Sequence, residues 1–236
     1  MSIRRLVIVA SLSSLLGLPT TGHTQPFALT AREDRAFGSR PGTLRIGDDG
    51  VVFDTADPKH RRVWHLDDVR QFRVESSRRL VIETFRSRGW KGAGRSRTYE
   101  YATGTDIPDA LVAFLLARVT RPVVTAVLPQ RRTTLAPLAV AVHHEGTDTA
   151  GTLALYDDGL AFEADRDGFA RYWRFSDLDA VLRQDRYRLY VAAFEGNREH
   201  VRPFLFTLKQ DPPPGFYDLL WRHLNSRSTG NPAPRP

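Results

Sequence analysis

Two segments of this chain repeat each other at a constant spacing of 109 residues. Residues 42–85 match residues 151–194 without a gap, with identical residues at 13 of 44 positions. The identical pairs are Gly42/Gly151, Thr43/Thr152, Leu44/Leu153, Asp48/Asp157, Asp49/Asp158, Gly50/Gly159, Phe53/Phe162, Arg62/Arg171, Trp64/Trp173, Asp68/Asp177, Arg79/Arg188, Leu80/Leu189 and Phe85/Phe194. A long-period repeat outweighs local propensity in choosing a fold, so we expect one structural unit to occur twice.

The apolar positions within each repeat mostly alternate with polar ones. This period of two is typical of strands with one buried face. Asp-Asp-Gly at 48–50 and at 157–159 predicts a tight hairpin, because glycine accepts a positive φ. Apolar stripes predict helices at about 108–119 and 214–225. The expected strands lie near 27–32, 42–47, 51–54, 61–66, 69–75, 79–85 and 97–103, and again near 138–144, 151–156, 160–164, 170–175, 178–183, 187–193 and 202–208.

Two loose motifs recur within this order of elements. Leu-x-Ile-x-Asp-Asp-Gly-Val-x-Phe occupies 44–53 and Trp-x-Leu-x-Asp-Val occupies 64–69, with counterparts at 153–162 and 173–178. Together with the element order they resemble the pleckstrin-homology-like superfold, specifically the bacterial PH-like and GRAM-type domains. The resemblance implies a mainly β (α+β) fold of two tandem PH-like β-rolls, each with about seven antiparallel strands and a C-terminal helix. It also implies binding of lipids, peptides or proteins rather than catalysis.

The first residues have the build of a secretory signal peptide. Arg4 and Arg5 precede an apolar run from Leu6 to Leu18, which is well short of the ~20 residues that a helix needs to cross a bilayer. We therefore expect a signal peptide at 1–24, with an uncleaved anchor as the alternative, and no transmembrane span once it is removed. The predicted location is periplasmic or secreted.

The rest of the chain divides into four expected parts. These are a first module at 27–120, a linker at 121–136, a second module at 137–225 and a disordered tail at 226–236.

Composition narrows the possible partners. The chain has no cysteine, which excludes disulfides and thiolate metal sites. Residues 27–130 hold 18 basic and 13 acidic residues, whereas residues 131–236 hold 14 of each. Because only three of the 34 basic residues are lysine, we read the arginine content as a general bias, and nucleic acid is not an expected partner.

One segment is a candidate anion-binding loop. Between two expected strands it carries five cations, one tryptophan and no acid, in the residues Arg86, Arg88, Trp90, Lys91, Arg95 and Arg97. Charge attraction combined with an aromatic side chain suits anionic head groups or polyanions. A solvated hairpin tip is the alternative. The second repeat has Glu-Gly-Asn-Arg-Glu-His at 195–200 instead, so the two repeats differ here.

Other chemistry-bearing residues favour structural roles. The hairpin Asp pairs offer too few spaced ligands for calcium, and Trp64 and Trp173 are expected in the core. Asp68 and Asp177 are expected to cap turns. The histidines are scattered, and only His143-His144-Glu145 suggests a weak metal site. We expect no catalytic residues, no metal and no cofactor.

The expected function is that of an exported, non-catalytic binding or scaffold protein of the cell envelope, which engages a protein partner through the two modules. The first alternative is an anionic lipid or polyanion binder that acts through residues 86–97, so an anionic envelope surface is a second possible partner. The second alternative is an uncharacterised hydrolase, because Ser, Asp and His can meet in space without a sequence motif.

Overall fold

The computed structural model describes residues 26–85, 96–129, 135–144, 147–166, 168–195 and 201–225. The expected signal peptide at 1–24 and the expected tail at 226–236 lie outside these residues. Within the described ranges, neither helix has the length and apolar character needed to cross a membrane.

Seven strands and a helix form the first half of the chain. They are β1 (Phe27–Asp34), β2 (Ser39–Gly47), β3 (Gly50–Asp54), β4 (Arg62–Trp64), β5 (Val69–Ser76), β6 (Arg79–Phe85), β7 (Ser96–Thr103) and α1 (Asp109–Arg118). A short strand, β8 (Val123–Thr125), follows. The second half contains β9 (Leu138–His144), β10 (Thr147–Leu155), β11 (Gly159–Ala164), β12 (Arg171–Arg174), β13 (Leu178–Arg183), β14 (Arg188–Ala193), β15 (Arg202–Leu208) and α2 (Phe216–Asn225). The prediction of a mainly β chain is therefore confirmed.

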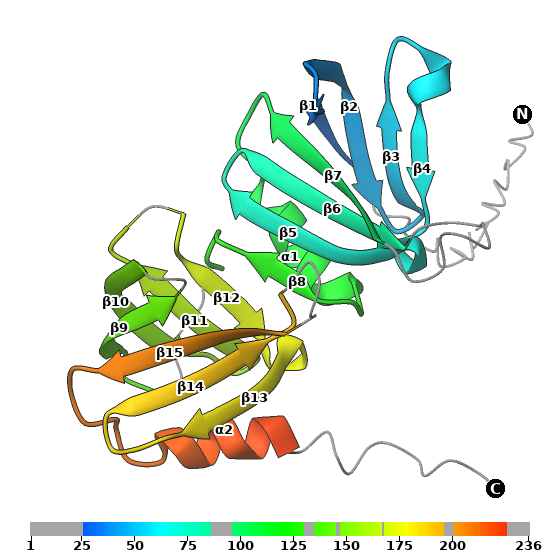
Figure 1. The fold of residues 1–236 in the computed structure, drawn as a ribbon. Coiled ribbons are helices and arrows are strands. Elements are labelled where there is room, and N and C mark those ends of the chain that lie inside the picture. Colours follow the sequence, from blue (N-terminus) through cyan, green and yellow to red (C-terminus); the bar gives the residue numbers. More distant parts are fainter. Residues whose placement is uncertain are drawn as a thin grey trace, which may run out of the picture.

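All the described strands belong to one sheet (Figure 1). Its order is β13-β14-β15-β9-β10-β11-β12-β8-β5-β6-β7-β1-β2-β3-β4, so the seven strands on each side of β8 follow the same order. The prediction of two separate β-rolls is wrong, because β8 joins the two sets. It pairs in parallel with β5 and antiparallel with β12. Sequence reasoning missed β8 because it is only three residues long and lies inside the segment expected to be a linker.

The apolar residues form two core clusters, and the first one crosses the boundary between the halves. It contains Leu44, Phe53 and Tyr101 from the first half, but also Tyr156 and Tyr172 from the second. The second cluster contains the alternate residues of the same second-half strands, such as Leu153, Leu155 and Trp173. Strands β10 to β12 are therefore buried on both faces, with one face packed in each cluster. The two halves are joined by these apolar contacts as well as by the strand pairing of β8.

The aromatic pairs inside the two clusters have matching geometry. Phe53 packs on Tyr101 with ring centroids 4.9 Å apart, and its repeat partner Phe162 packs on Phe206 at 5.3 Å. Trp64 packs on Tyr99 at 4.7 Å with the planes at 54°, and Trp173 packs on Phe204 at 4.9 Å and 57°. Strand pairing explains why these aromatic pairs match. Arg79 of β6 pairs with Ala102 of β7, and its repeat partner Arg188 of β14 pairs with Thr207 of β15. In this last strand of each half, equivalent residues are therefore 105 rather than 109 positions apart.

The two hairpin glycines are required by close approach of the backbone. A Cβ at Gly50 would overlap the carbonyl oxygen of Trp64, and a Cβ at Gly159 would overlap that of Trp173. Gly50 also has φ of 124°, as the hairpin pattern predicts, whereas Gly159 does not have a positive φ. In both repeats the glycine is needed because the neighbouring strand, β4 or β12, passes too close for a Cβ. A positive φ is needed only at Gly50.

Arg174 joins the two halves through polar contacts. Its guanidinium donates to the carbonyl oxygens of Leu116 (2.8 Å), Val119 (2.7 Å) and Arg121 (2.8 Å), which belong to the end of α1 and the residues after it. It also forms a bidentate pair with Asp177, at 2.7 and 2.9 Å. A cation that binds the last carbonyls of a helix stabilises the helix end, so α1 is fixed to the second half.

Asp177 completes this junction. Its carboxylate accepts the backbone N–H of Val123 at the start of β8, at 3.4 Å. Burial raises the pKa of Asp177 above its usual value, although the hydrogen bonds and charge of Arg174 act in the opposite direction. The prediction that Asp177 caps its own turn is therefore wrong, because the backbone N–H that its carboxylate accepts belongs to Val123. Its counterpart Asp68 has the predicted capping role, accepting the backbone N–H of His65 at 3.2 Å.

Replacing Arg174 by alanine is expected to lower the free energy of unfolding by about 3–5 kcal/mol, because Asp177 would remain buried without its partner. Urea unfolding followed by circular dichroism measures this change. The control is Arg188→Ala, which removes an exposed ion pair with Asp185 and should cost less than about 1 kcal/mol. Equal losses in the two variants would contradict the role given to Arg174.

Candidate functional site

The predicted anion-binding loop lies almost wholly outside the described residues. Arg86, Arg88, Trp90, Lys91 and Arg95 are not described, and Arg97 lies near the start of β7. The side chain of Arg97 is exposed, and its guanidinium carbon lies 5.1 Å from the ring centroid of Tyr99.

Around Arg97, the structure brings together four side chains that we call the Arg62 cluster: Arg62, Trp64, Arg97 and Tyr99. The guanidinium carbon of Arg62 lies 5.4 Å from the Tyr99 centroid, so two cations contact one ring that also packs on Trp64. Such cation–π contacts are favourable and do not use the guanidinium hydrogen-bond donors. Arg62 also forms an ion pair with Glu33, whose Oε1 lies 3.7 Å from Arg62 Nε.

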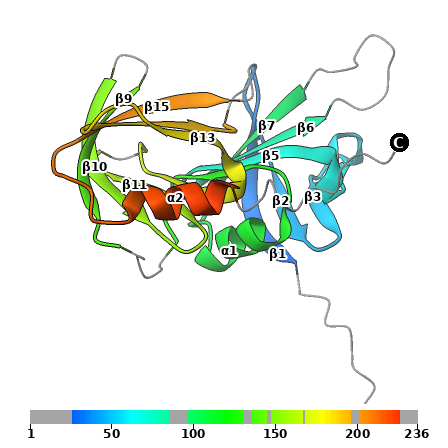
Figure 2. The ribbon, with the colours of Figure 1, turned by 90° about the horizontal axis from the view of Figure 1, so that it is seen from below.

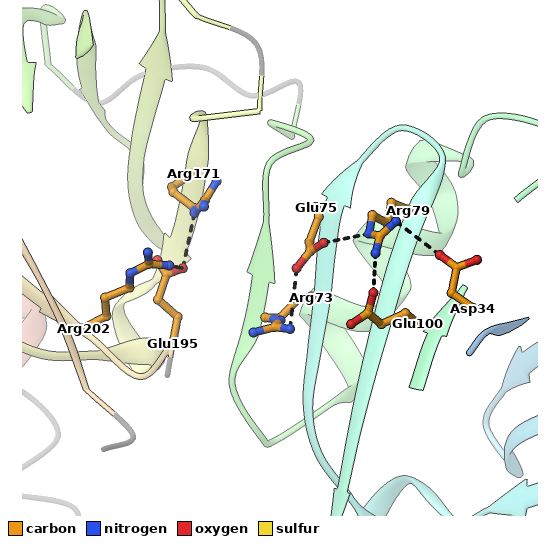
Figure 3. Close-up of polar contacts among 8 residues, drawn as sticks. All are labelled: Asp34, Arg73, Glu75, Arg79, Glu100, Arg171, Glu195 and Arg202. Carbon is orange, nitrogen blue, oxygen red and sulfur yellow. Dashed lines mark hydrogen bonds and ion pairs between the residues drawn. The ribbon is translucent and has the colours of Figure 1, made fainter. Parts of the chain in front are cut away.

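Glu195 occupies the corresponding place in the second half. Its side chain is 3 % exposed and accepts hydrogen bonds from Trp173 Nε1 at 2.8 Å and from Arg171 Nε at 3.3 Å. Arg202 approaches the same carboxylate at 4.0 Å. We call these four residues the Glu195 cluster. Figure 3 shows Arg171 and Arg202 converging on the carboxylate from different strands. The buried charge is therefore compensated by two cations and an indole N–H.

Three members of each cluster correspond, whereas Tyr99 matches Phe204 outside the Glu195 cluster and Glu195 has no carboxylate counterpart. Arg62 matches Arg171 and Trp64 matches Trp173 at the 109-residue spacing, while Arg97 matches Arg202 in the last strand. Position 86, which matches Glu195, is arginine. Comparison of the two repeats could have found the change from Glu195 to arginine at position 86, because the neighbouring arginine and tryptophan are identical in both repeats.

A second polar network fixes the strands of the first half to one another. Arg79 on β6 binds Glu75 of β5 (3.1 Å), Asp34 of β1 (3.3 Å) and Glu100 of β7 (Figure 3). Burial alone would lower the pKa of Arg79, but the three carboxylates outweigh it and raise the pKa. All four side chains are partly exposed, so this network links neighbouring strands and contributes modestly to stability.

The sheet has an open edge at β13. Among the described strands, β13 pairs only with β14, and α2 lies beside it (Figures 1 and 2). Arg183 at the end of β13 lies over the ring of Tyr217 on α2, 5.0 Å from its centroid. These residues line a shallow hollow of about 410 Å³ together with Asp211 and Pro212–Pro214. Burial raises the pKa of the Tyr217 phenol, whose hydroxyl oxygen has no hydrogen-bond partner among the described residues.

One histidine lies in an arrangement that resembles a hydrolase triad. His143 on β9 contacts Asp148 through Nδ1 at 2.6 Å and the Thr207 hydroxyl through Nε2 at 3.0 Å. However, Asp148 is 74 % and His143 is 43 % exposed. Catalytic triads work in concave sites from which water is excluded. The three residues come from neighbouring strands of one ladder, so we interpret the row as cross-strand stabilisation.

The remaining predicted sites have structural partners. Asp48 forms an ion pair with Arg118 at 3.4 Å, and Asp158 accepts the Tyr172 hydroxyl at 2.6 Å. Trp173 is fully buried, as expected, and Trp64 is partly buried. In the part of the chain that is described, His, Asp and Glu do not gather into groups of three or more that could hold a metal ion. Glu145, part of the weak metal candidate, is outside that part.

Comparisons with known proteins do not show a family. No family model matches the chain, and no curated protein matches it. Among solved structures, the Spt16D–Pob3N heterodimer is 11 % identical, with 82 % of this chain and 99 % of the other covered and a TM-score of 0.31. The Bacillus subtilis inhibitor of motility (MotI/DgrA) is also 11 % identical, with coverage of 89 % and 99 % and a TM-score of 0.16. Both scores are too low to support an argument about fold or function.

Replacing Glu195 by alanine is expected to lower the free energy of unfolding by about 3 kcal/mol or more, because Arg171 and the Trp173 indole would lose a buried partner. Urea unfolding measures the change. Asp185→Ala is the control, since its pair with Arg188 is exposed. With the backbone N–H of Tyr187 that it also accepts, it should contribute about 1 kcal/mol. A Glu195→Ala protein as stable as the parent would show that the carboxylate does not organise the cluster.

Proposed function

We propose that this protein is an exported, non-catalytic binding protein of the cell envelope that holds a partner protein along β13. The partner contributes an extended segment, which adds to the sheet as a further strand parallel to β13. This mode of recognition uses main-chain hydrogen bonds for affinity and side-chain pockets for selectivity.

One observation carries this proposal: the equivalent edge in the first half already holds an added strand. Strand β5, which matches β13 in the repeat, pairs in parallel with β8. The backbone N–H of Phe72 donates to Pro122 O at 3.3 Å, and the N–H of Ala126 donates to Val74 O at 2.8 Å. This edge of the repeated unit therefore has a geometry that accepts a parallel strand.

The corresponding groups of β13 are the N–H of Val181 and the C=O of Arg183. The register supports the match, because each strand has an irregularity at the same place, between Val69 and Gln71 in β5 and between Leu178 and Ala180 in β13. An unpaired row of backbone donors and acceptors is a template for another strand.

The residues that follow α2 in this sequence are poorly suited to fill the edge. In the first half, β8 begins five residues after α1 ends at Arg118. Residues 226–236 contain no Val, Ile or Leu and include three prolines, and proline cannot donate to a ladder. A segment from another protein is therefore the occupant that we propose, with β-branched or apolar residues like the Val-Val-Thr of β8.

Exposed apolar side chains lie on both elements that border this edge. Leu182 on β13 is 57 % exposed and Trp221 on α2 is 67 % exposed. Exposed aromatic and aliphatic side chains of this kind are typical anchors in protein interfaces.

Export and the absence of catalysis are parts of the same proposal. Export is supported by the basic start at Arg4 and Arg5 and by the apolar run that follows. A non-catalytic role is supported by the exposed geometry of the His143 row and by the structural partners of the hairpin acids.

A photo-reactive amino acid placed at Leu182 is expected to crosslink a discrete protein in the envelope fraction of the native cell. Phe37 is the control, because it is 95 % exposed and lies between β1 and β2, away from both open edges of the sheet. Val181→Pro should reduce the Leu182 adduct several-fold, because proline removes the outward N–H.

Arg183→Pro is a second variant for the same purpose, and circular dichroism reports whether each variant folds. Adducts of equal yield at Leu182 and Phe37, or a Leu182 adduct that persists in both folded proline variants, would contradict strand addition at β13. Recovery of the adduct only from the cytoplasm would contradict export.

A further inference from the structure

The Arg62 cluster contains hydrogen-bond donors that lack the acceptor found in the Glu195 cluster. In the second half, Trp173 Nε1 and Arg171 Nε both donate to the Glu195 carboxylate, at 2.8 and 3.3 Å. In the first half, Arg62 Nε is buried without a hydrogen-bond partner among the described residues. No hydrogen bond from Trp64 Nε1 to any described residue is present either.

The framework around these donors is the same in both halves. Trp64 packs on Tyr99, and Trp173 packs on Phe204, with centroid distances of 4.7 and 4.9 Å and plane angles of 54° and 57°. The arginine at the start of the last strand lies over that second ring in each case, at 5.1 Å for Arg97 and 6.0 Å for Arg202. The Trp64 indole is thus held on the same scaffold as the Trp173 indole. The arginines differ, since Arg62 stacks on Tyr99 whereas Arg171 also donates to the carbonyl oxygens of Gly168 and Ala170.

The chain offers no carboxylate at this place from the loop that follows β6. Position 86, which matches Glu195, is arginine, and residues 86–97 contain no Asp or Glu. The nearest described carboxylate is Glu33, whose Oε1 lies 3.7 Å from Arg62 Nε while its Oε2 accepts from Arg40 at 3.0 Å. Glu33 therefore offsets part of the charge, but it forms no hydrogen bond with Arg62 Nε.

We propose that Arg62, Trp64 and Arg97 form a binding site for the carboxylate of an external ligand, which takes the place that the Glu195 carboxylate holds in the second half. The ligand carboxylate accepts the Arg62 and Trp64 donors and lies beside the Arg97 cation. Charge-assisted hydrogen bonds of this type are among the stronger polar contacts in proteins. The carboxylate could come from a free small acid or from a Glu side chain of a peptide, since both present the same acceptor group.

Acetate is the probe that tests the site, because it is the carboxylate group of Glu195 with one methyl. Nuclear magnetic resonance follows the indole N–H signals of the four tryptophans at constant pH and ionic strength, and Trp64→Phe identifies the Trp64 signal. We expect a saturable shift of the Trp64 signal, while the Trp173 signal, already bonded to Glu195, stays in place.

The variants Arg97→Gln and Arg62→Gln should each weaken acetate binding about tenfold, the effect of losing a hydrogen bond to a charged group. Arg97 is exposed, so its substitution leaves the fold intact. Arg202→Gln is the matched control at the equivalent position and should leave the Trp64 titration unchanged. A titration that is absent, or that Arg97→Gln does not alter, overturns the proposal, as does an equal shift with chloride.

Two further measurements extend the test. The capped tripeptide Ac-Gly-Glu-Gly-NH₂, titrated in the same way, distinguishes the sources: tighter binding than acetate indicates a protein side chain, and weaker binding indicates a free acid. In the second half, acetate should raise the unfolding temperature of Glu195→Ala more than that of the parent protein, because it refills the vacated place. Failure of this rescue would contradict the equivalence on which the site rests.

Discussion

The pairing of β8 with both β5 and β12 is the constraint on which the rest of the structure depends. A three-residue strand makes few hydrogen bonds, so it needs support from its surroundings. Arg174 and Asp177 provide that support, since one holds the end of α1 and the other accepts the N–H of Val123. With β8 fixed, the two sets of seven strands become one sheet, and Tyr156 and Tyr172 pack into the core of the first half.

Repetition gives the two halves a common framework and different polar chemistry. Packing positions are kept, as the aromatic pairs Trp64–Tyr99 and Trp173–Phe204 show. Charged positions vary, because surface and semi-buried charges tolerate substitution wherever another group can compensate. The second half neutralises its arginines with Glu195, whereas the first half has arginine at the matching sequence position, 86. The Arg62 donor without a described hydrogen-bond acceptor follows from this divergence, whereas the open edge at β13 follows from the lack of a described strand equivalent to β8.

Much of the fold could be predicted from the sequence, and the reason is the repeat. Each expected strand is present within a few residues, and even the first one, the least certain on pattern, occurs at Phe27–Asp34. What could not be predicted depends on long-range contacts. Strand β8 has no periodicity to detect in three residues, and Arg174 corresponds to His65 in the first repeat, so the comparison of repeats gave no indication of its role. The separate β-rolls were therefore a wrong prediction.

The candidate site was only partly accessible to sequence reasoning. The cluster of cations at 86–97 was recognisable from composition, but of its named residues the structure describes only Arg97. Arg62 and Trp64 lie more than thirty residues before Arg97 in the chain, and their contacts with Tyr99 bring them next to it. The hydrogen bond from Trp173 to Glu195 likewise required coordinates, since an indole in an apolar strand indicates only a core position.

The central claim is that β8 and the Arg174 junction make one cooperative unit from two repeated halves. Urea unfolding of two single-tryptophan proteins tests it most directly. One retains Trp64 and the other Trp173, with the remaining tryptophans changed to phenylalanine. One cooperative unit predicts that, within each of these two proteins, tryptophan fluorescence and far-ultraviolet circular dichroism report a single transition with the same midpoint, because neither half can lose its structure without exposing the core shared with the other. Two well-separated midpoints would show that the halves unfold independently and would contradict the account.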